Sequence, residues 1–390
     1  MNWSTKIPLT SISAIFWILS LFGIFLVFTS IYEISSVEAK YVFSKKWAEL
    51  GTDTGKFNNP HGIAIDSSGR LYVADTGNNR IQQFRLATPC PSGTTQIVSG
   101  VCFVRAWGTP GTGNGQFNNP TDVALDSAGR VYVTDNGNHR IQMFKGTGAF
   151  MKAWSTDGPG TAQFYRLIGI AVDASTNDIY AIDNTSPPYV HKFRLTSTCP
   201  TGTTQAISGV CFISKWEIGD YSEPPHFKYT ARGIAVNSLT HEVFVSAETA
   251  MANLQLINRY TSDGTELIGW GDSADSTDGK FDGPTGIAIN SQGLVYVADT
   301  YNHRIQTFRL ANPCPSDTTQ VAPGVCFVTK WGTPGSANGQ FSIPIDVAIG
   351  GPSGLIYVLD NYNNRIQEFY WKTDVGGPGG GGPSPNIAVK

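Results

Sequence analysis

The sequence is dominated by one stretch, residues 57–84, that returns almost letter for letter. Clear copies occupy residues 117–144, 281–308 and 341–369. Blurred copies begin at Phe164 and Phe227. Self-similarity at such a period marks a repeat architecture, in which each unit buries its apolar surface against its neighbours. The chain is therefore predicted to be an array of like units.

The repeat unit reads as four short strands. In the first copy, residues 62–66 and 71–74 are apolar runs, residues 80–84 form a third strand, and residues 103–107 form a fourth that ends in tryptophan. Glycine and asparagine lie between them, where tight turns need a positive φ. The two inner strands are apolar on both faces, as expected of a sheet sandwiched between neighbours. Four antiparallel strands per unit predict one blade of a β-propeller.

The number of blades follows from the aromatic residues that open and close each unit. The opening residues are Phe57, Phe117, Phe164, Phe227, Phe281 and Phe341. The closing residues are Trp47, Trp107, Trp154, Trp216, Trp270 and Trp331, displaced by one strand. Residues 41–47 are therefore expected to supply the fourth strand of the last blade, which closes the ring. We predict an all-β, six-bladed β-propeller over residues 40–371, which suits a chain with 43 glycines and only 15% charged residues.

Four short blocks resemble the NHL repeat. They are residues 78–82, 138–142, 302–306 and 363–367, each with the pattern Asn-(Asn/His)-Arg-Ile-Gln. Each lies in a copy that also carries Tyr-Val-(Ala/Thr/Leu)-Asp. The resemblance implies a six-bladed propeller. It implies much less about function, because one fold hosts many chemistries.

The two ends of the chain differ from the repeats. Residues 7–32 hold no charged side chain and are long enough to span a hydrocarbon core. We expect residues 1–39 to form a transmembrane anchor and short linker, with a cleaved signal peptide as the alternative. Residues 372–390, rich in glycine and proline, are predicted to be a disordered tail.

The cysteines form three pairs with one spacing. They are Cys90 and Cys102, Cys199 and Cys211, and Cys314 and Cys326. Each pair brackets an insert between the third and fourth strands of blades one, three and five, so three disulfides are expected. Buried free thiols and a zinc site are the alternatives. Disulfides need an oxidising compartment, so the propeller is predicted to lie outside the cytoplasm, anchored to a membrane, or secreted if the N-terminus is cleaved.

Blades three and four depart from the pattern. Tyr189 stands where the other copies have arginine, and residues 243–260 lack both the aspartate and the arginine. Simple drift of a repeat and specialisation of its binding loops both explain this.

The mouth of the central channel, where inner strands begin, is the expected ligand site. Alignment of the copies places a candidate funnel there: His61, Thr121, Asp122, Arg232, Thr285 and Asp346. This polar variety suits a small ligand or a peptide loop. Capping of backbone amides is an alternative role for the two aspartates.

A second charged set recurs in four blades. It comprises Asp75 and Arg80, Asp135 and Arg140, Asp299 and Arg304, and Asp360 and Arg365. Recurrence argues against catalysis, which needs unlike groups at one place. These pairs are predicted to brace the second turn by hydrogen bonds and an ion pair.

Together these features favour a membrane-tethered binding or scaffold module for a protein, peptide or glycan. No cofactor is predicted. The alternative is a metal-dependent lyase or hydrolase with zinc or calcium, resembling the peptide-amidating lyase or lactonase propellers, around His61, Arg232, Asp122 and Asp346. The amidating lyase needs three channel histidines, and only His61 occupies such a position. The net charge of −3 argues against nucleic acid as a partner.

Overall fold

A computed structural model describes residues 40–155, 164–219, 229–249, 254–351 and 354–372. The predicted anchor at residues 7–32, Phe227 and nearly all of the glycine-rich tail lie outside these residues. In the part of the chain that is described, no helix is long and apolar enough to cross a membrane.

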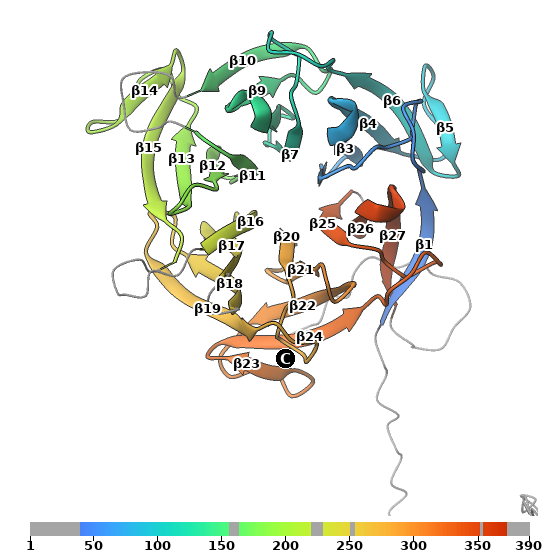
Figure 1. The fold of residues 1–390 in the computed structure, drawn as a ribbon, viewed down its shortest axis with the longest axis vertical. Helices are drawn as coiled ribbons and strands as arrows, with labels where there is room; N and C mark the ends of the chain where they lie inside the picture. The colour runs from blue at the N-terminus through green and yellow to red at the C-terminus, as the bar shows by residue number, and fades with distance from the viewer. Residues whose placement is uncertain (1–39, 156–163, 220–228, 250–253, 352–353, 373–390) are drawn as a thin grey trace, which may run out of the picture. The chain divides into compact units, whose positions relative to one another are not determined.

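Six antiparallel sheets surround a central channel, and each sheet is one blade, numbered here in chain order (Figure 1). Blade 1 contains β2 (Gly62–Ile65), β3 (Arg70–Asp75), β4 (Arg80–Leu86), β5 (Thr95–Val98) and β6 (Val101–Trp107). Blade 2 contains β7 (Pro120–Leu125), β8 (Val131–Asp135), β9 (Arg140–Phe144) and β10 (Phe150–Ser155). Blade 3 contains β11 (Leu167–Val172), β12 (Asp178–Asp183), β13 (Tyr189–Arg194), β14 (Thr204–Ile207) and β15 (Val210–Glu217).

The second half of the chain repeats this order. Blade 4 contains β16 (Tyr229–Asn237), β17 (Glu242–Thr249), β18 (Leu254–Tyr260) and β19 (Glu266–Ser273). Blade 5 contains β20 (Pro284–Ile289), β21 (Val295–Asp299), β22 (Arg304–Leu310), β23 (Thr319–Ala322) and β24 (Val325–Trp331). Blade 6 contains β25 (Pro344–Gly350), β26 (Leu355–Asp360), β27 (Arg365–Lys372) and β1 (Lys40–Trp47).

The ring closes through β1, as the displaced tryptophans predicted. β1 pairs antiparallel with β27 from Lys40 opposite Lys372 to Trp47 opposite Ile366. The first described strand thus completes the blade built by the last ones, and Figure 1 shows the two side by side. The prediction of an all-β, six-bladed propeller closed by its N-terminal strand is confirmed.

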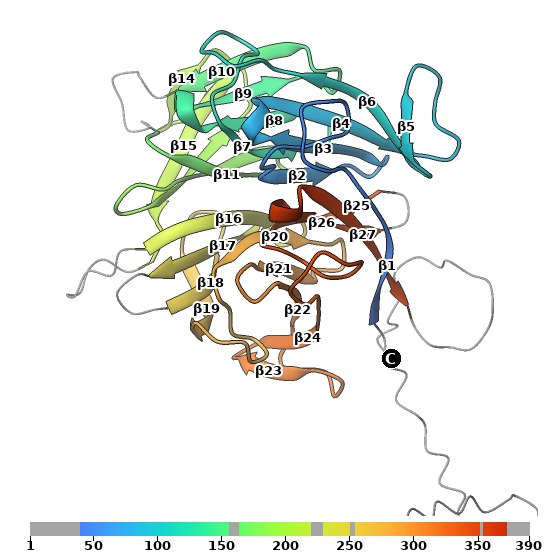
Figure 2. The same cartoon turned by 45° about the vertical axis from the view of Figure 1, so that its right-hand side comes forward.

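The three cysteine inserts each add a fifth strand. β5, β14 and β23 pair with the fourth strands β6, β15 and β24 at the outer edge of their blades (Figures 1 and 2). The predicted disulfides Cys90–Cys102, Cys199–Cys211 and Cys314–Cys326 are all present, with Cα atoms 5.6, 5.5 and 5.6 Å apart. Three disulfides indicate an extracytoplasmic location. The sequence predicted the three disulfides but not that each insert adds a fifth strand to its sheet.

Aromatic side chains fill the space between blades. Trp47 is 3% exposed and packs edge-on against Phe84 of blade 1 and Tyr357 of blade 6, with ring centroids 6.5 and 6.2 Å away. The opening Phe57 is fully buried beside Phe84. Edge-to-face packing at these separations is the favoured arrangement of aromatic rings. Recurring phenylalanines and tryptophans such as these therefore form the aromatic contacts between neighbouring blades.

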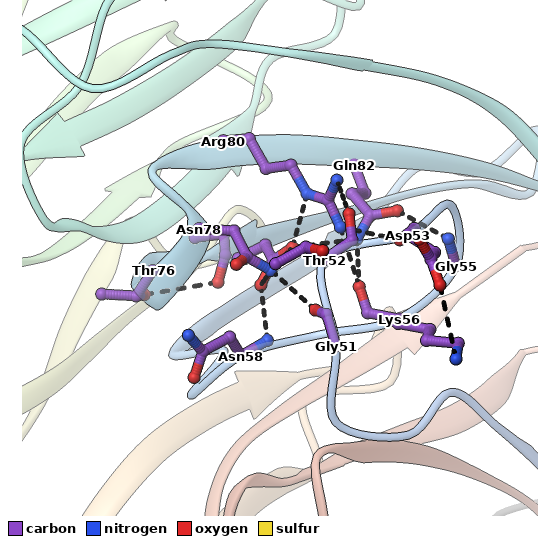
Figure 3. Close-up of polar contacts among 12 residues, drawn as sticks. Gly51, Thr52, Asp53, Gly55, Lys56, Asn58, Thr76, Asn78, Arg80 and Gln82 are labelled. Atoms are coloured by element: carbon purple, nitrogen blue, oxygen red, sulfur yellow. Dashed lines mark hydrogen bonds and ion pairs between the residues drawn. The ribbon is translucent and has the colours of Figure 1, made fainter.

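The aspartate–arginine pairs lie in a compact network, called the latch below and drawn in Figure 3 for blade 1. Buried Asp75 accepts hydrogen bonds from Arg80 Nε at 2.6 Å, from Asn78 Nδ2 at 2.9 Å, from Gln82 Nε2 at 3.0 Å and from the Asn58 amide at 2.8 Å. Arg80 also donates to three backbone carbonyls of the loop at residues 52–56. A single guanidinium thus joins the second turn to the loop that enters the blade.

The latch recurs with the same partners in three more blades. Its members are Asp135, Asn138, Arg140 and Gln142 in blade 2, Asp299, Asn302, Arg304 and Gln306 in blade 5, and Asp360, Asn363, Arg365 and Gln367 in blade 6. The aspartate–arginine contact is 2.6 to 2.7 Å in all four. In each described latch, the arginine, asparagine and glutamine donate to groups of the same blade and of the loop that enters it.

At every junction at least one side-chain hydrogen bond ties a blade to the next around the channel mouth. The bonds are Thr76 to the Pro120 carbonyl, Thr121 to the Leu167 carbonyl, the Ala231 amide to Asn184, Ser246 to the Thr285 carbonyl, Thr300 to the Pro344 carbonyl and Asn361 to the Pro60 carbonyl. The donors and acceptors differ in kind, but the ring of bonds is closed. This closure holds the inner strands in a fixed register about the channel.

Candidate functional site

A pocket of about 290 Å³ opens at the channel mouth. All six funnel residues expected from the sequence line it: His61, Thr121, Asp122, Arg232, Thr285 and Asp346. His61 immediately precedes β2, and the others lie on the inner strands β7, β16, β20 and β25. Equivalent positions of five blades thus converge at one place, because inner strands all begin at the same face of the ring.

The two aspartates are tied to backbone amides. Asp122 accepts from the Val123 amide at 2.7 Å and, with its other oxygen, from the Ile170 amide of blade 3 at 2.8 Å. Asp346 accepts from the Val347 amide at 2.8 Å and from the Ile63 amide of blade 1 at 2.8 Å. Each carboxylate therefore spans two adjacent blades. This geometry matches the amide-capping role that the sequence left open as an alternative.

Burial makes these carboxyl groups hold their protons. Desolvation raises the pKa of Asp122 to about 7, against the lowering effect of its two amide hydrogen bonds. Desolvation raises the pKa of Asp346 well above its ordinary value, and the nearby charge of Asp122 raises it further. Two carboxyl groups sharing a buried channel resist becoming charged together. Near neutral pH the pocket therefore carries less negative charge than its composition suggests.

His61 offers a neutral acceptor to the pocket. Its Nδ1 donates to the Asn59 carbonyl at 3.0 Å, which leaves Nε2 as the nitrogen with a lone pair. Burial lowers the pKa of the imidazole, so the ring is neutral near pH 7. Among the described residues, Nε2 has no hydrogen-bond partner.

Arg232 is held by a residue that the sequence did not single out. Its Nη2 donates to Glu248 Oε1 of the neighbouring strand β17, while its buried Nε has no hydrogen-bond partner. Glu248 occupies the position that is Thr76 in blade 1. A charged residue in the degenerate fourth blade, opposite an unusual arginine, is the signal that could have found this pair.

The two threonines are committed to the wall. Thr121 Oγ1 lies 2.9 Å from Thr134 Oγ1 and also donates to the Leu167 carbonyl at 3.0 Å. Thr285 Oγ1 lies 2.6 Å from Thr300 Oγ1. Their hydroxyls are therefore already engaged in hydrogen bonds between strands and between blades.

Loops supply further groups that strand alignment missed. Asn119, Asn136, Arg166, Asn184 and Tyr301 also line the pocket. Arg166 and Asn119 are exposed, and no described residue bonds their side chains. Tyr301 is 53% exposed, and Tyr165 and Tyr362, on loops of the same face, are 73% and 70% exposed. These positions lie outside the strands, so no period-two pattern marks them.

The pocket residues do not fit the metal centre of the alternative interpretation. His61 is the single histidine that lines the pocket. All four oxygens of Asp122 and Asp346 already accept backbone amides. Across the described ranges, no three histidine, cysteine, aspartate or glutamate side chains gather where they could hold a metal ion. A zinc centre of three histidines or a calcium centre of several free carboxylates would need groups that this site does not offer.

Comparison with known proteins places the chain among NHL-repeat propellers. The NHL repeat family model matches residues 57–84, 117–144, 281–308 and 341–369. Human NHL repeat-containing protein 3 is 38% identical over 99 residues, which cover 24% of this chain and 24% of that protein. Rat peptidylglycine alpha-amidating monooxygenase is 35% identical over 107 residues, 26% of this chain and 10% of that protein. The chain thus spans about a quarter or less of these two relatives.

Solved structures share the fold at low identity. An auxiliary nutrient binding protein from Bacteroides thetaiotaomicron aligns with a TM-score of 0.52 and 12% identity, over 86% of this chain and 77% of that one. At such identity the likeness extends to the propeller architecture alone.

Proposed function

We propose that this chain, an NHL-repeat six-bladed propeller, is an extracytoplasmic binding module that takes a protein, peptide or glycan at its channel mouth. In this proposal residues 7–32 tether it to a membrane, or it is secreted if that segment is cleaved. The three disulfides support the compartment, since such bonds persist where the environment is oxidising.

The observation that carries the proposal is a set of unlike, uncommitted groups in one pocket. His61 Nε2, the side chains of Asn119 and Arg166, the Nε of Arg232 and exposed Tyr301 come one each from blades 1 to 5. Ligand sites combine an apolar wall with a few convergent polar groups. Here isoleucines of the inner strands form the wall, and these five groups supply hydrogen bonds of different kinds.

The surrounding face favours a ligand larger than the pocket itself. Tyr165, Tyr301 and Tyr362 are more than half exposed on the loops around the mouth. Tyrosine supplies large contact area with a polar tip, and it is enriched where proteins bind partners. A peptide loop or sugar could therefore enter the pocket while the rest of the partner lies across these rings.

The test is binding of the full chain to glycan and peptide arrays, followed by affinity measurement on the hits. The variants Arg166→Ala and Tyr301→Ala are each expected to weaken binding at least tenfold, the scale of interface hot spots. Leu239→Ala is the matched control, since Leu239 is 70% exposed on the turn between β16 and β17, at the other face. Equal affinity of the two mouth variants and the control would exclude the mouth as the binding site.

A further inference from the structure

A second cavity lies between blades 1 and 2, away from the channel mouth. It has a volume of about 380 Å³ and is lined on one side by Arg70, Gln83, Arg85 and Arg105 of blade 1. Its other wall is formed by turns of blade 2 at residues 128–129 and 146–147. These turns leave the opposite ends of the strands from the loops that line the mouth. The cleft is therefore a separate site on the other face of the ring, and it is independent of the function proposed above.

The three guanidiniums in this cleft are only partly used. Arg70 Nε donates to Asp66 at 2.5 Å, Arg85 Nη1 to Ser68 Oγ at 3.2 Å, and Arg105 Nη1 to the Thr147 carbonyl at 2.8 Å. Each guanidinium has five N–H donors. Most donors of all three therefore have no partner among the described residues, and no carboxylate lines the cavity itself.

Gln83 adds a buried group with an unmet hydrogen bond. It is 3% exposed, its Nε2 donates to the Tyr72 hydroxyl at 2.8 Å, and its Oε1 is buried without a partner. If the amide turns by half a rotation, the tyrosine donates to Oε1 and the NH₂ group becomes the unpaired end. Buried polar atoms in native proteins nearly always have a partner, so Gln83 leaves an unmet hydrogen bond in the wall of the cleft.

The set of three arginines occurs in blade 1 alone; blade 2 has Arg130, Lys145 and Lys152 at the same positions, with Arg130 held by Asp126. The other two blades with an insert keep the equivalent of Arg85, as Arg194 and Arg309. In blade 3, Arg194 is neutralised by Asp178, whose two oxygens accept from it at 2.5 and 2.7 Å. The equivalents of Arg70 and Arg105 are Asp178 and Ser214 in blade 3, and Leu294 and Thr329 in blade 5. A role in bracing the insert would need the same residues in all three blades.

We propose that this cleft binds a tetrahedral oxyanion, as a phosphate or sulfate ester of a larger ligand. Arg70, Arg85 and Arg105 reach it from three adjacent strands, β3, β4 and β6. Planar guanidinium forks donate two parallel hydrogen bonds to such oxyanions, and three forks around one space match an anion with three exposed oxygens. Gln83 lies in the same wall, on β4 between Arg70 and Arg105.

The test is calorimetric titration of the full chain with inorganic phosphate, inorganic sulfate and acetate at low ionic strength. The double variant Arg70→Leu and Arg105→Thr places the blade 5 residues in blade 1, and it is expected to weaken phosphate or sulfate binding at least tenfold. Arg309→Thr in blade 5 is the matched control and should bind as the wild type does. Unchanged binding by the double variant, or acetate binding as tight as phosphate, overturns the proposal.

Two further measurements keep the result decisive. If the double variant does not fold, Arg105→Thr alone serves, because Arg105 is exposed and its loss leaves the core intact. Glucose 6-phosphate and glucosamine 6-sulfate then distinguish the two esters by which competes better with the inorganic ion, and failure of both to compete overturns the assignment. Arg166→Ala at the mouth should leave anion binding unchanged, so the failure of either site can be told from the failure of the other.

Discussion

Blades 1, 2, 5 and 6 carry the latch, whereas blades 3 and 4 have lost it. In blade 1, Asp75 accepts from Arg80, Asn78 and Gln82. In blade 3 the equivalent Asp183 stands opposite Tyr189 in the same register and, among the described residues, accepts the backbone amides of Tyr165 and Arg166 in place of side chains. Burial raises the pKa of Asp183, and its two amide hydrogen bonds offset this only in part.

In blade 4 an ion pair lies at the channel mouth, and the latch aspartate is absent. Ala247 occupies the position of the latch aspartate, and the next residue, Glu248, pairs with Arg232 at the mouth. Yet the core strands of blades 3 and 4 are intact, with Val190 and Val245 fully buried. A blade therefore needs its strand pairing and apolar core, while the latch is an addition that can be given up.

Blades 3 and 4 also supply polar groups to the pocket. Arg166 and Asn184 come from blade 3 and Arg232 from blade 4, and all three line the pocket. His61, Asn119 and Tyr301 line the same pocket from blades that keep the latch, so the pocket draws its polar groups from both kinds of blade.

The largest effect is expected when the latch arginine of blade 1 is replaced by its blade 3 counterpart, tyrosine. Arg80→Tyr should lower the free energy of unfolding by about 3–5 kcal/mol, because it leaves the buried Asp75 carboxylate without its cation. Urea unfolding measures the change. Tyr189→Phe in blade 3 is the control and should cost less than about 1 kcal/mol, since it removes one hydrogen bond to Glu217. Equal losses would mean that the latch does not set the two groups of blades apart.

The disulfides test whether blade 3 compensates for its missing latch. Replacing Cys90 and Cys102 by serine should cost roughly 3 kcal/mol, because the closed loop no longer restricts the unfolded chain. The pair Cys199 and Cys211 closes a loop of the same sequence separation, 12 residues, so the same loss is expected. Thermal unfolding of the two double variants gives the comparison. A larger loss in blade 3 would show that its staple supports a weaker blade.

The channel carboxyl group of Asp122 predicts a pH dependence of the free energy of unfolding. Burial raises the pKa of Asp122 from 3.8 to about 7, so the folded state binds a proton that the unfolded state has released. Its contribution to stability is full below pH 4 and is lost as pH rises toward 7. Urea unfolding of the wild type and of Asp122→Asn over this range should show a smaller decline in the variant. An identical decline in both would assign it to other groups.

The smallest expected effect concerns the residue after the second turn. Asn79 and Asn364 adopt a left-handed backbone and accept an amide of the next blade, and His303 does the same through Nδ1. His303→Asn should therefore change the free energy of unfolding by no more than about 0.5 kcal/mol. His303→Ala removes the acceptor and should cost about 1 kcal/mol or more. A large loss from the asparagine variant would give the histidine a role of its own.

The sequence was most informative where one signal repeats. Six opening phenylalanines and six displaced tryptophans sufficed to predict the blade number and the closing strand β1, because aromatic residues at these positions pack between blades, as Trp47 and Phe57 do. Equal cysteine spacing predicted the disulfides for a similar reason, since a hairpin brings its ends together. Glu248 and Arg166 escaped prediction because neither belongs to a repeated position. Gln83 and the arginine cluster of blade 1 escaped because Arg70, Gln83, Arg85 and Arg105 come together only when β3, β4 and β6 pair in the sheet.

By itself the sequence determined the fold class, the ring closure, the three disulfides and the six funnel residues at the start of the inner strands. These features follow from the periodic burial of residues, and that period can be read directly from the sequence. Only the tertiary structure decided what each side chain does there. Asp122 and Asp346 each use one oxygen for an amide of the next blade, whereas Arg105 and Gln83 keep donors or acceptors unused. That division depends on which atoms of neighbouring blades come within hydrogen-bond distance, and no pattern within one repeat records it.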